Sequence, residues 1–540
     1  MPAVIQPCDA GVVGSTKASA ICPIPSRRWV IAATALGSGM AFLDSTVINV
    51  SLPAVQASLD ATHQDVQWVY GAYALVLTAL LLVGGSLGDH YGRRRVFSLG
   101  VVLFATSSLW CAFCASSEQL IAARAAQGVG GAMMVPGSLA ILGASFDETL
   151  RAKAIGTWAA LSGTAMAVGP ILGGWLVENV SWRAAFLINV PLALITLLIV
   201  FRHVPESRDP EAARLDSGGA LLATAGLGAL VYGLIKTSTA GLGDAAVLGP
   251  LTVGVLALGS FVFVESKSEK AMVPLSLFRS RNFDGVSLFT LLFYMALTGS
   301  LYFVPFLLMQ VHGYSALAVG GIFLPFVAIA FVLGYLSGRI VTRFGVRLPL
   351  VVASLALGAS FLLFALPGAD HQGSYWTTFF PAMVVQGFGM ALVIAPLTTV
   401  ALNSVKGPHS GLASGVNNAV CRAAGLFAVA VLGTLISTSF SAHLDARLET
   451  MELSPEVREA VDAQKDKLGA AEAPEEVDAA TSARIEEAMA ESFVAAFRLI
   501  MFVAVGLALA SALVAVVISP QHPASARPWS SLRALIHRGT

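Results

Sequence analysis

Apolar residues along this chain gather in long runs that are separated by short polar or charged segments. A transmembrane α-helix needs about 20 mostly apolar residues, and most of the runs reach that length. The run at 217–236, rich in glycine and alanine, is the weakest, and without it the count falls from fourteen spans to thirteen. We expect fourteen membrane spans, near residues 29–52, 66–88, 96–115, 118–143, 153–177, 184–201, 217–236, 245–265, 284–311, 315–338, 348–367, 375–400, 408–436 and 493–518.

The composition also predicts an all-α membrane protein. Of the 540 residues, 56% are hydrophobic and only 12% are charged, whereas soluble domains carry about 25% charged residues. The formal net charge is zero, so no nucleic-acid partner is indicated. The five cysteines are too few and too scattered for a disulfide framework or a zinc site. Because no glycine-rich phosphate-binding loop is present, we expect neither direct use of ATP nor a cofactor.

Lysines and arginines predict the orientation of the chain in the membrane. If both termini lie on one side, most basic residues fall on that side, and the short loops opposite contain only Arg183. Cytoplasmic loops are enriched in Lys and Arg, so we expect both termini in the cytoplasm. Removing one middle span would disrupt this distribution, which favours fourteen spans. Residues 1–28 lack a basic start followed by an apolar core and are expected to be a retained tail, not a signal peptide.

The segment 437–492 is the only long one that we expect outside the membrane on the non-cytoplasmic side. It contains fourteen acidic and five basic residues. Its stretches at 454–468 and 482–492, separated by Pro474, predict two short amphipathic helices. A solvated helical hairpin that closes the outer face is the simplest interpretation. An outer gate or a partner-binding site is the alternative.

Three charged residues fall inside apolar runs, where a charge is costly unless it is paired or hydrated. Asp44 lies deep in the first predicted span, Arg124 in the fourth and Arg422 in the thirteenth. We expect Asp44 to bind and release a proton as its surroundings change, with Arg124 approaching and leaving it. The alternative is a static polar contact of Asp44 with Arg124 or with Asn49.

The loop after the second span resembles the signature loop of the major facilitator superfamily. It reads Gly-Ser-Leu-Gly-Asp-His-Tyr-Gly-Arg-Arg-Arg at 85–95 and lies on the basic side. A weaker copy at 334–347 lacks the acid. The resemblance implies a cytoplasmic gate in which the arginines pair with acids of the opposite half and hold the outward-facing state. We expect this gate to consist of Gly85, Asp89, Gly92, Arg93 and Arg94.

Further stretches resemble the fourteen-helix branch of the drug:proton antiporters within this superfamily. Residues 43–53 resemble its first-helix signature, and residues 182–191 resemble the entry to its sixth span. Residues 124–131 resemble its proton-transfer helix, which implies that Arg124 modulates the proton carried by Asp44. Residues 169–174 resemble its antiporter motif, in which glycines allow helices to approach closely and proline bends the helix. The motif residues are Gly169, Pro170, Gly173 and Gly174.

The resemblance implies two six-helix bundles with two inserted helices. We expect the first bundle at 29–201, a linker with the inserted pair at 202–283, and the second bundle at 284–518, which includes the outer loop 437–492. Cytoplasmic tails are expected at 1–28 and 519–540. The substrate cavity is expected near the membrane midplane between the bundles. Its candidate residues, aromatic or hydrogen-bonding, are Trp68, Tyr73, Tyr294, Tyr302, Asn417 and Arg422.

The function implied is proton-coupled efflux of drugs or other amphipathic small molecules across the cytoplasmic membrane. Such a protein is no enzyme; it works in the lipid bilayer with the proton gradient as its energy source, and we expect a functional monomer. One alternative is a dedicated exporter of a single lipid, siderophore or antibiotic. A more remote one is an intramembrane enzyme or sensor on a transporter scaffold, although no nucleophile–base pair is visible in the sequence.

Overall fold

A computed structural model describes residues 26–208, 216–241, 243–268, 273, 275–368, 374–403, 410–451, 453–474 and 477–518. These residues form helices joined by turns, and no strand occurs among them. Most of the predicted tail 1–28, and all of the predicted tail 519–540, lie outside the described residues.

The helices follow the predicted apolar runs closely. The first part of the chain forms α1 (Arg27–Leu59), α2 (His63–Tyr91), α3 (Arg93–Ala112), α4 (Ser117–Ser145), α5 (Glu148–Asn179), α6 (Ala184–Leu187) and α7 (Asn189–His203). The middle part forms α8 (Ser217–Ala240), α9 (Ala245–Lys267) and the 3₁₀-helix η3 (Leu275–Arg279). The last part forms α10 (Arg281–Phe306), the π-helix η4 (Leu307–Val311), α11 (Ala316–Ile322), α12 (Leu324–Phe344), α13 (Arg347–Phe364), α14 (Tyr375–Asn403), α15 (Ser410–Leu448), α16 (Pro455–Asp462), the 3₁₀-helix η5 (Lys465–Ala470) and α17 (Ala479–Val517).

Thirteen helical spans among the described residues are long and apolar enough to cross a membrane, and α2 makes a fourteenth if its two bent parts are one span. The bend in α2 is 50° and lies between Leu81 and Val83. It precedes the glycine pair Gly84–Gly85, a sequence that commonly permits a kink. The uncertain span is thus α2, and not the run at 217–236, which forms the continuous helix α8.

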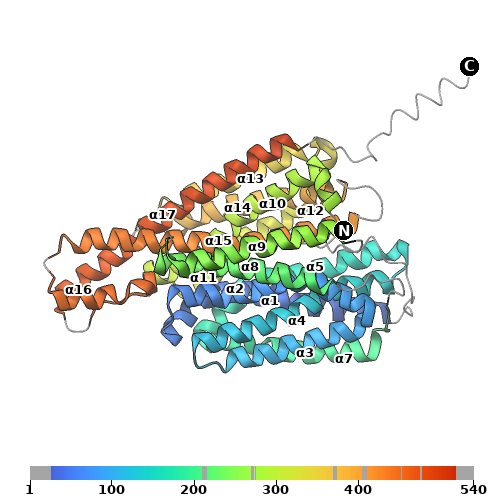
Figure 1. Cartoon of the computed structure of the whole chain (residues 1–540), viewed down its shortest axis with the longest axis horizontal. Coiled ribbons are helices and arrows are strands. Elements are labelled where there is room, and N and C mark those ends of the chain that lie inside the picture. The colour runs from blue at the N-terminus through green and yellow to red at the C-terminus, as the bar shows by residue number, and fades with distance from the viewer. Residues whose placement is uncertain are drawn as a thin grey trace, which may run out of the picture.

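The chain folds into two groups of helices that lie side by side (Figure 1). We call α1–α7 the N-terminal half and α10–α17 the C-terminal half. The helices α8 and α9 pack on each other, and α8 also packs on α2 and α15, which belong to different halves. We call the end of the bundle that carries α16 the cap end, and the end where α3 begins the arginine end. Helix α1 begins and α17 ends at the arginine end (Figure 1), as an even number of passes requires.

The predicted outer segment 437–492 is helical, but its helices differ from the expectation. Helix α15 continues past 436 to Leu448, and α17 begins at Ala479, so residues 482–492 extend the last span and do not form a separate helix. The predicted helix at 454–468 is the shorter α16 followed by η5, with a break at Leu468, whose φ is 55°. The result is a projection of α15, α16 and α17 beyond the bundle (Figure 1).

A tight turn at the cap end connects α1 to α2. Asp60 ends α1 in the left-handed region, with φ 49°. Thr62 then caps α2: its Oγ1 accepts from the Asp65 backbone N–H at 3.1 Å, while the Asp65 carboxylate accepts from the Thr62 N–H at 3.0 Å. This reciprocal capping box satisfies two donors at the start of the helix. It therefore fixes where the first residue of α2, His63, lies.

Candidate functional site

Asp44 and Arg124 form a buried ion pair between α1 and α4. Arg124 Nη1 lies 2.6 Å from Asp44 Oδ2, and the two side chains are 0% and 2% exposed. The contact of Asp44 with Arg124, which the sequence analysis considered, is therefore present in this conformation. The other partner considered for Asp44 was Asn49, whose buried Oδ1 has no hydrogen-bond partner. A pair so deeply buried is retained only where further hydrogen bonds satisfy both groups.

Neutral polar side chains supply those hydrogen bonds. Gln127 Oε1 accepts from Arg124 Nη1 at 2.5 Å, and Gln127 Nε2 donates to Asp44 Oδ1 at 2.8 Å. Asn189 Nδ2 donates to the same carboxylate oxygen at 3.2 Å. Both amides also donate to Ser108 Oγ, at 2.8 and 3.3 Å. Asp44, Ser108, Arg124, Gln127 and Asn189, which we call the polar network, thus connect α1, α3, α4 and α7.

One donor group of Arg124 makes no hydrogen bond within this network. Its Nε donates to the Val69 carbonyl at 3.2 Å, while the buried Nη2 has no hydrogen-bond partner. The guanidinium carbon lies 4.4 Å from the ring centroid of Tyr73 and 5.7 Å from that of Phe186, distances at which a cation is attracted to an aromatic face. Arg124 can therefore stay buried when the bond to Asp44 changes.

The sequence motifs contained two network residues that were not selected as site residues. Gln127 lies in the stretch 124–131 and Asn189 in the stretch 182–191. A charge in an apolar run is a stronger signal of a site than a neutral amide is. A buried amide nevertheless needs hydrogen-bond partners, just as a charge does. Ser108 carried no signal, because serine is common in membrane helices.

The antiporter-motif glycines make close contact with two neighbouring helices. A Cβ at Gly169 would lie 1.9 Å from Thr46 Oγ1, and one at Gly173 would lie 3.0 Å from the Val47 Cα, so both glycines face α1. Gly174 faces α11 across the two halves, since a Cβ there would lie 2.3 Å from the Ala316 carbonyl oxygen. This agrees with the expected role of small residues in close helix packing.

Helix α11 also contributes a glycine to its contact with α5. A Cβ at Gly320 would lie 2.2 Å from the Pro170 carbonyl oxygen. Near the cap end of α5, the Glu178 carboxylate accepts a hydrogen bond from the Leu317 N–H at 3.0 Å. The two halves therefore meet closely along α5 and α11 toward the cap end.

At the arginine end, the predicted gate residues are held within the N-terminal half. Arg93, 2% exposed, donates from Nη2 to Asp89 Oδ1 at 2.7 Å, and its backbone N–H donates to the Ser207 carbonyl at 2.8 Å. The Arg94 N–H donates to Glu206 Oε1 at 3.0 Å. Gly92 adopts φ 111°, a backbone conformation that favours glycine. A Cβ there would also lie 2.8 Å from the same Glu206 oxygen, which is a second reason for glycine at this position.

The expected pairing of these arginines with acids of the opposite half is not what the structure shows. Arg93 forms an ion pair with Asp89 of α2, whereas Arg94 and Arg95 form ion pairs with Glu206, which follows the end of α7. In this conformation the halves are joined toward the cap end. Sequence reasoning missed Glu206 because it lies more than a hundred residues from the loop. Gly85 packs against Pro136 of α4.

The candidate cavity residues do not form one cluster. Tyr73 lies against Arg124, and Asn417 Oδ1 accepts from Thr290 Oγ1 of α10 at 2.9 Å. Arg422 Nε donates to Asn418 at 3.1 Å, and its buried Nη2 has no hydrogen-bond partner. Tyr302 packs with other rings of α10, and Tyr294 packs on Phe293. Trp68 faces the inserted helices, with its ring 6.0 Å from Tyr232 of α8, so its expected place in a central cavity is wrong.

Two cavities lie between the halves. A small one of about 70 Å³ is lined mainly by apolar side chains of α1, α5, α12 and α14, among them Phe42, Trp158, Met166, Phe326 and Met390. A larger one of about 990 Å³ opens at the cap end between α1, η4, η5 and α17.

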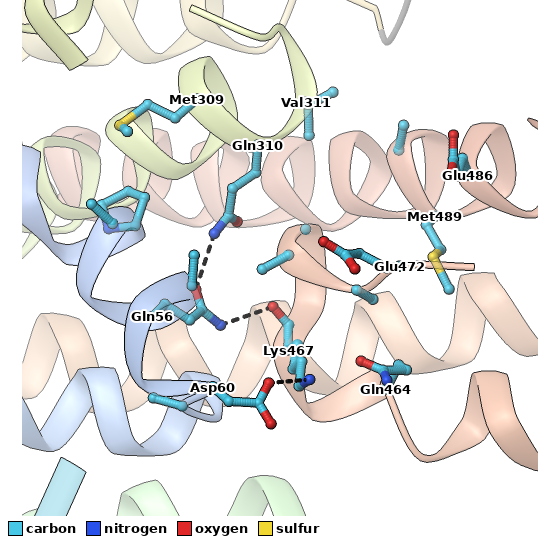
Figure 2. A pocket seen from close by; sticks show the side chains of 18 of the residues that line it. Gln56, Asp60, Met309, Gln310, Val311, Gln464, Lys467, Glu472, Glu486 and Met489 are labelled. Atoms are coloured by element: carbon cyan, nitrogen blue, oxygen red, sulfur yellow. Dashed lines mark hydrogen bonds and ion pairs between the residues drawn. The ribbon is translucent and has the colours of Figure 1, made fainter. Parts of the chain in front are cut away.

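The larger cavity holds a chain of polar contacts that joins both halves to the 465–472 segment. Figure 2 shows Gln56 between two partners: Gln310 Nε2 donates to Gln56 Oε1, and Gln56 Nε2 donates to the Lys467 carbonyl, both at 3.0 Å. Lys467 Nζ also lies 2.5 Å from Asp60 Oδ1. These contacts therefore connect the two halves at the cap end.

Among the described residues, no group of three His, Cys, Asp or Glu side chains is arranged to hold a metal ion. Cys111 and Cys114 are buried and unbonded to each other.

Comparisons with known proteins agree with the motifs. The family model of the Major Facilitator Superfamily matches residues 34–430. The chain is 35% identical over 416 residues to the tetracenomycin C resistance and export protein of Streptomyces glaucescens, covering 76% of each chain. It is 34% identical over 438 residues to the puromycin resistance protein pur8 of Streptomyces alboniger, covering 81% of this chain and 87% of the relative.

Other relatives and solved structures point the same way. The multidrug resistance protein Stp of Mycobacterium tuberculosis (strain ATCC 25618 / H37Rv) is 34% identical over 425 residues, 77% of each chain. A bacterial homolog to the human lysosomal transporter Spinster, solved in an inward-facing conformation, shares the fold with a TM-score of 0.60 at 18% identity, covering 92% of this chain and all of that one. The chain is therefore a multi-pass membrane protein that belongs to the Major Facilitator Superfamily.

Proposed function

We propose that this protein exports drugs or other amphipathic small molecules across the cytoplasmic membrane in exchange for protons. Its relatives include proteins named for resistance to or export of antibiotics, and these share about a third of their sequence with it over three quarters of the chain or more. The observation that carries the proton coupling is the buried Asp44–Arg124 pair, because a titratable carboxylate in a membrane interior is a functional candidate by default.

The polar network supports a mechanism in which Asp44 carries the proton. In the described conformation Asp44 lies against Arg124 and accepts from Gln127 and Asn189. A proton that binds to a carboxylate oxygen cancels the charge that holds Arg124, and the guanidinium then keeps Gln127, Val69 and the ring of Tyr73 as partners. Protonation therefore releases a contact between α1 and α4 without exposing a bare charge.

Alternating access follows from where the halves touch. The close contacts between α5 and α11, α2 and α15, and α1 and η4 lie toward the cap end. With the arginine end in the cytoplasm, as the distribution of basic residues supports, these contacts hold the halves together on the outer side. Substrate would bind between the halves from the inside, and the small apolar cavity beside Phe42 and Met390 marks where they enclose such a space.

A dedicated exporter of one antibiotic is the second candidate. The observation that favours it is that several relatives are named for a single compound, such as tetracenomycin C, methylenomycin A or puromycin. Both candidates share the same mechanism and differ only in the breadth of the substrates.

The test is a measurement of proton flux in everted membrane vesicles that contain the protein. After a pH gradient is set up, tetracenomycin C, puromycin or ethidium is added and the internal pH is followed. We expect at least one compound to dissipate the gradient in proportion to its uptake, and vesicles without the protein to show no response. Uptake that leaves the pH gradient unchanged would show that transport is not coupled to protons.

A further inference from the structure

A buried histidine lies at the cap-end junction of the two halves, outside the polar network. His63 is the first residue of α2 and is 5% exposed. Three rings of α10 surround it: the centroids of Tyr302, Phe303 and Phe306 lie 6.4, 5.8 and 5.9 Å from the imidazole. His63 therefore belongs to the N-terminal half but packs into the C-terminal half.

One turn further along α2, Gln67 bonds directly to the opposite half. Its Nε2, in a side chain only 2% exposed, donates to the Val429 carbonyl of α15 at 3.2 Å and lies 3.3 Å from His63 Nε2. The amide fits there because position 433 is glycine: a Cβ on Gly433 would lie 1.5 Å from Gln67 Nε2. We call His63, Gln67, Val429 and Gly433 the His63 latch.

The hydrogen-bond chemistry of the latch requires a neutral imidazole. An amide NH₂ has two protons, so Gln67 can donate to both the Val429 carbonyl and His63 Nε2 only if that ring nitrogen accepts. Protonation turns both imidazole nitrogens into donors, and Nε2 would then point a proton at the NH₂ group. Turning the amide over would satisfy the imidazolium but would remove the bond to Val429.

Among the described residues, no acidic side chain forms an ion pair or hydrogen bond with His63. Asp65 is committed to the N-terminus of α2, where its carboxylate accepts from Thr62. Asp60 is paired with Lys467 of η5. Gln67 and Val429 are neutral. Tyr302 of α10 lies beside His63, and its ring packs edge to face on Tyr70 of α2. The charged side chains of α15 are Arg422, Asp445 and Arg447, of which Arg422 bonds to Asn418, Asp445 to Lys465 and Arg447 to Glu491.

We propose that His63 is a second proton-binding site of the transport cycle and that its proton comes from the cap side. The cap end can close only when His63 carries no extra proton. This inference rests on the proposed alternating access. When α2 moves away from α10 and α15, water reaches the imidazole, and Nε2 takes a proton from a hydronium ion. The imidazolium must return that proton to water before Gln67 can bond to Val429 again. Acid on the cap side therefore favours the open cap end.

The size of the effect follows from linkage. An exposed histidine titrates near pH 6.5, whereas the closed latch holds His63 without a proton. One proton bound only in the open state changes the ratio of open to closed molecules by up to about tenfold per pH unit below that value. Above it the ratio is constant.

Spin-label distance measurements on the full-length protein in lipid nanodiscs test the proposal. Labels are placed at Val180→Cys and Leu366→Cys, which are exposed positions at the cap ends of the two halves, in a background without native cysteines. The distance distribution is recorded from pH 5 to pH 8 for the parent protein, His63→Gln and His443→Gln. The last is the matched control, because His443 is an exposed histidine at the same end that bonds only within α15.

We expect acid to populate a longer distance in the parent and in His443→Gln, and His63→Gln to lose this pH dependence. Gly433→Ala, which displaces the Gln67 amide, should populate the longer distance at every pH. A parent without pH dependence, or a His63→Gln protein that responds to pH as the parent does, would overturn the proposal; if His63→Gln does not fold, an unchanged Gly433→Ala would do so. Because these distances need no substrate or proton gradient, they are independent of the vesicle test of antiport.

Discussion

At the scale of single residues, the Asp44–Arg124 pair changes how the proton site is understood. The sequence left open whether Arg124 approaches and leaves Asp44 or stays in static contact with it, and the structure shows both groups buried and bonded to each other in this conformation. An arginine cannot shed its charge in a protein, but a carboxylate can take up a proton. Asp44 is therefore the member of the pair whose charge can change.

A double-mutant cycle tests this asymmetry. Asp44→Asn leaves the Arg124 charge without a counter-ion, so we expect a lower melting temperature than in the parent. In Arg124→Gln, Asp44 can become neutral by binding a proton, so the loss should be smaller. The double variant Asp44→Asn/Arg124→Gln should be more stable than Asp44→Asn alone, with a coupling of about 0.5–3 kcal/mol. Thermal unfolding followed by size-exclusion chromatography measures this, and strictly additive losses would show that the pair does not stabilise the fold.

The sequence identified the charged members of the site and missed the neutral ones. Asp44 and Arg124 were predictable because a charge in an apolar run needs an explanation. Gln127, Asn189 and Ser108 complete the network, but Gln127 lies 83 and Asn189 145 residues from Asp44 in the sequence. Only the packing of α1, α3, α4 and α7 brings them together. The contact of Glu206 with the Arg93–Arg95 segment was unpredictable for the same reason.

At the scale of helices, the junction of α5 and α11 depends on glycines. Gly320→Ala would place a methyl group against the Pro170 carbonyl, and overpacking of this kind costs about 1–3 kcal/mol. We expect this variant to lose efflux because the halves can no longer close at the cap end. The neighbouring Gly321→Ala, where a Cβ meets nothing within 4 Å, is the matched control and should transport normally. Equal activity of the two variants in a drug-efflux assay would contradict the importance of this contact.

The two loops at the arginine end should differ in importance. Asp89→Asn removes the partner of the buried Arg93, so we expect strong loss of transport with normal expression and insertion. Arg343→Gln should matter less, because Arg343 lies over its neighbour Phe344 in a loop without an acid. Efflux rates normalised to the amount of folded protein provide the comparison. If both substitutions reduce efflux equally, the loops serve only to set the topology.

Helix positions followed from the sequence, whereas bends and extensions did not. The apolar runs predicted where the spans lie because burial in a membrane needs a minimum length, but α15 runs on to Leu448 and α17 begins already at Ala479. The glycine pair 84–85 beside the bend in α2 is a local signal that permits a kink, and Gly84 also lies close to Ala132 of α4. The extension of α17 back to Ala479 accompanies the packing of α17 on α15, a tertiary contact that no local pattern encodes.

At the scale of the whole molecule, the orientation in the membrane is the first prediction to check. In a background without native cysteines, a membrane-impermeant thiol reagent is added to intact cells. We expect it to label Glu459→Cys on α16, at the cap end, and to spare Arg95→Cys at the arginine end, although both positions are exposed. After the cells are opened, both should react. Labelling of Arg95→Cys in intact cells would reverse the proposed direction of transport.

The central claim joins the residue to the whole molecule: the titration of Asp44 drives export. The most direct measurement is the substrate-induced pH change in proteoliposomes that contain the parent protein, Asp44→Asn or Asp44→Glu, with equal amounts of folded protein by size-exclusion chromatography. We predict a clear proton flux for the parent and a reduced one for Asp44→Glu, whose carboxylate is displaced by about one methylene but still titrates. Asp44→Asn keeps nearly the same size and cannot titrate, so it should give no flux. A fully coupled Asp44→Asn protein would show that the proton travels elsewhere and that the buried pair is only a structural contact between α1 and α4.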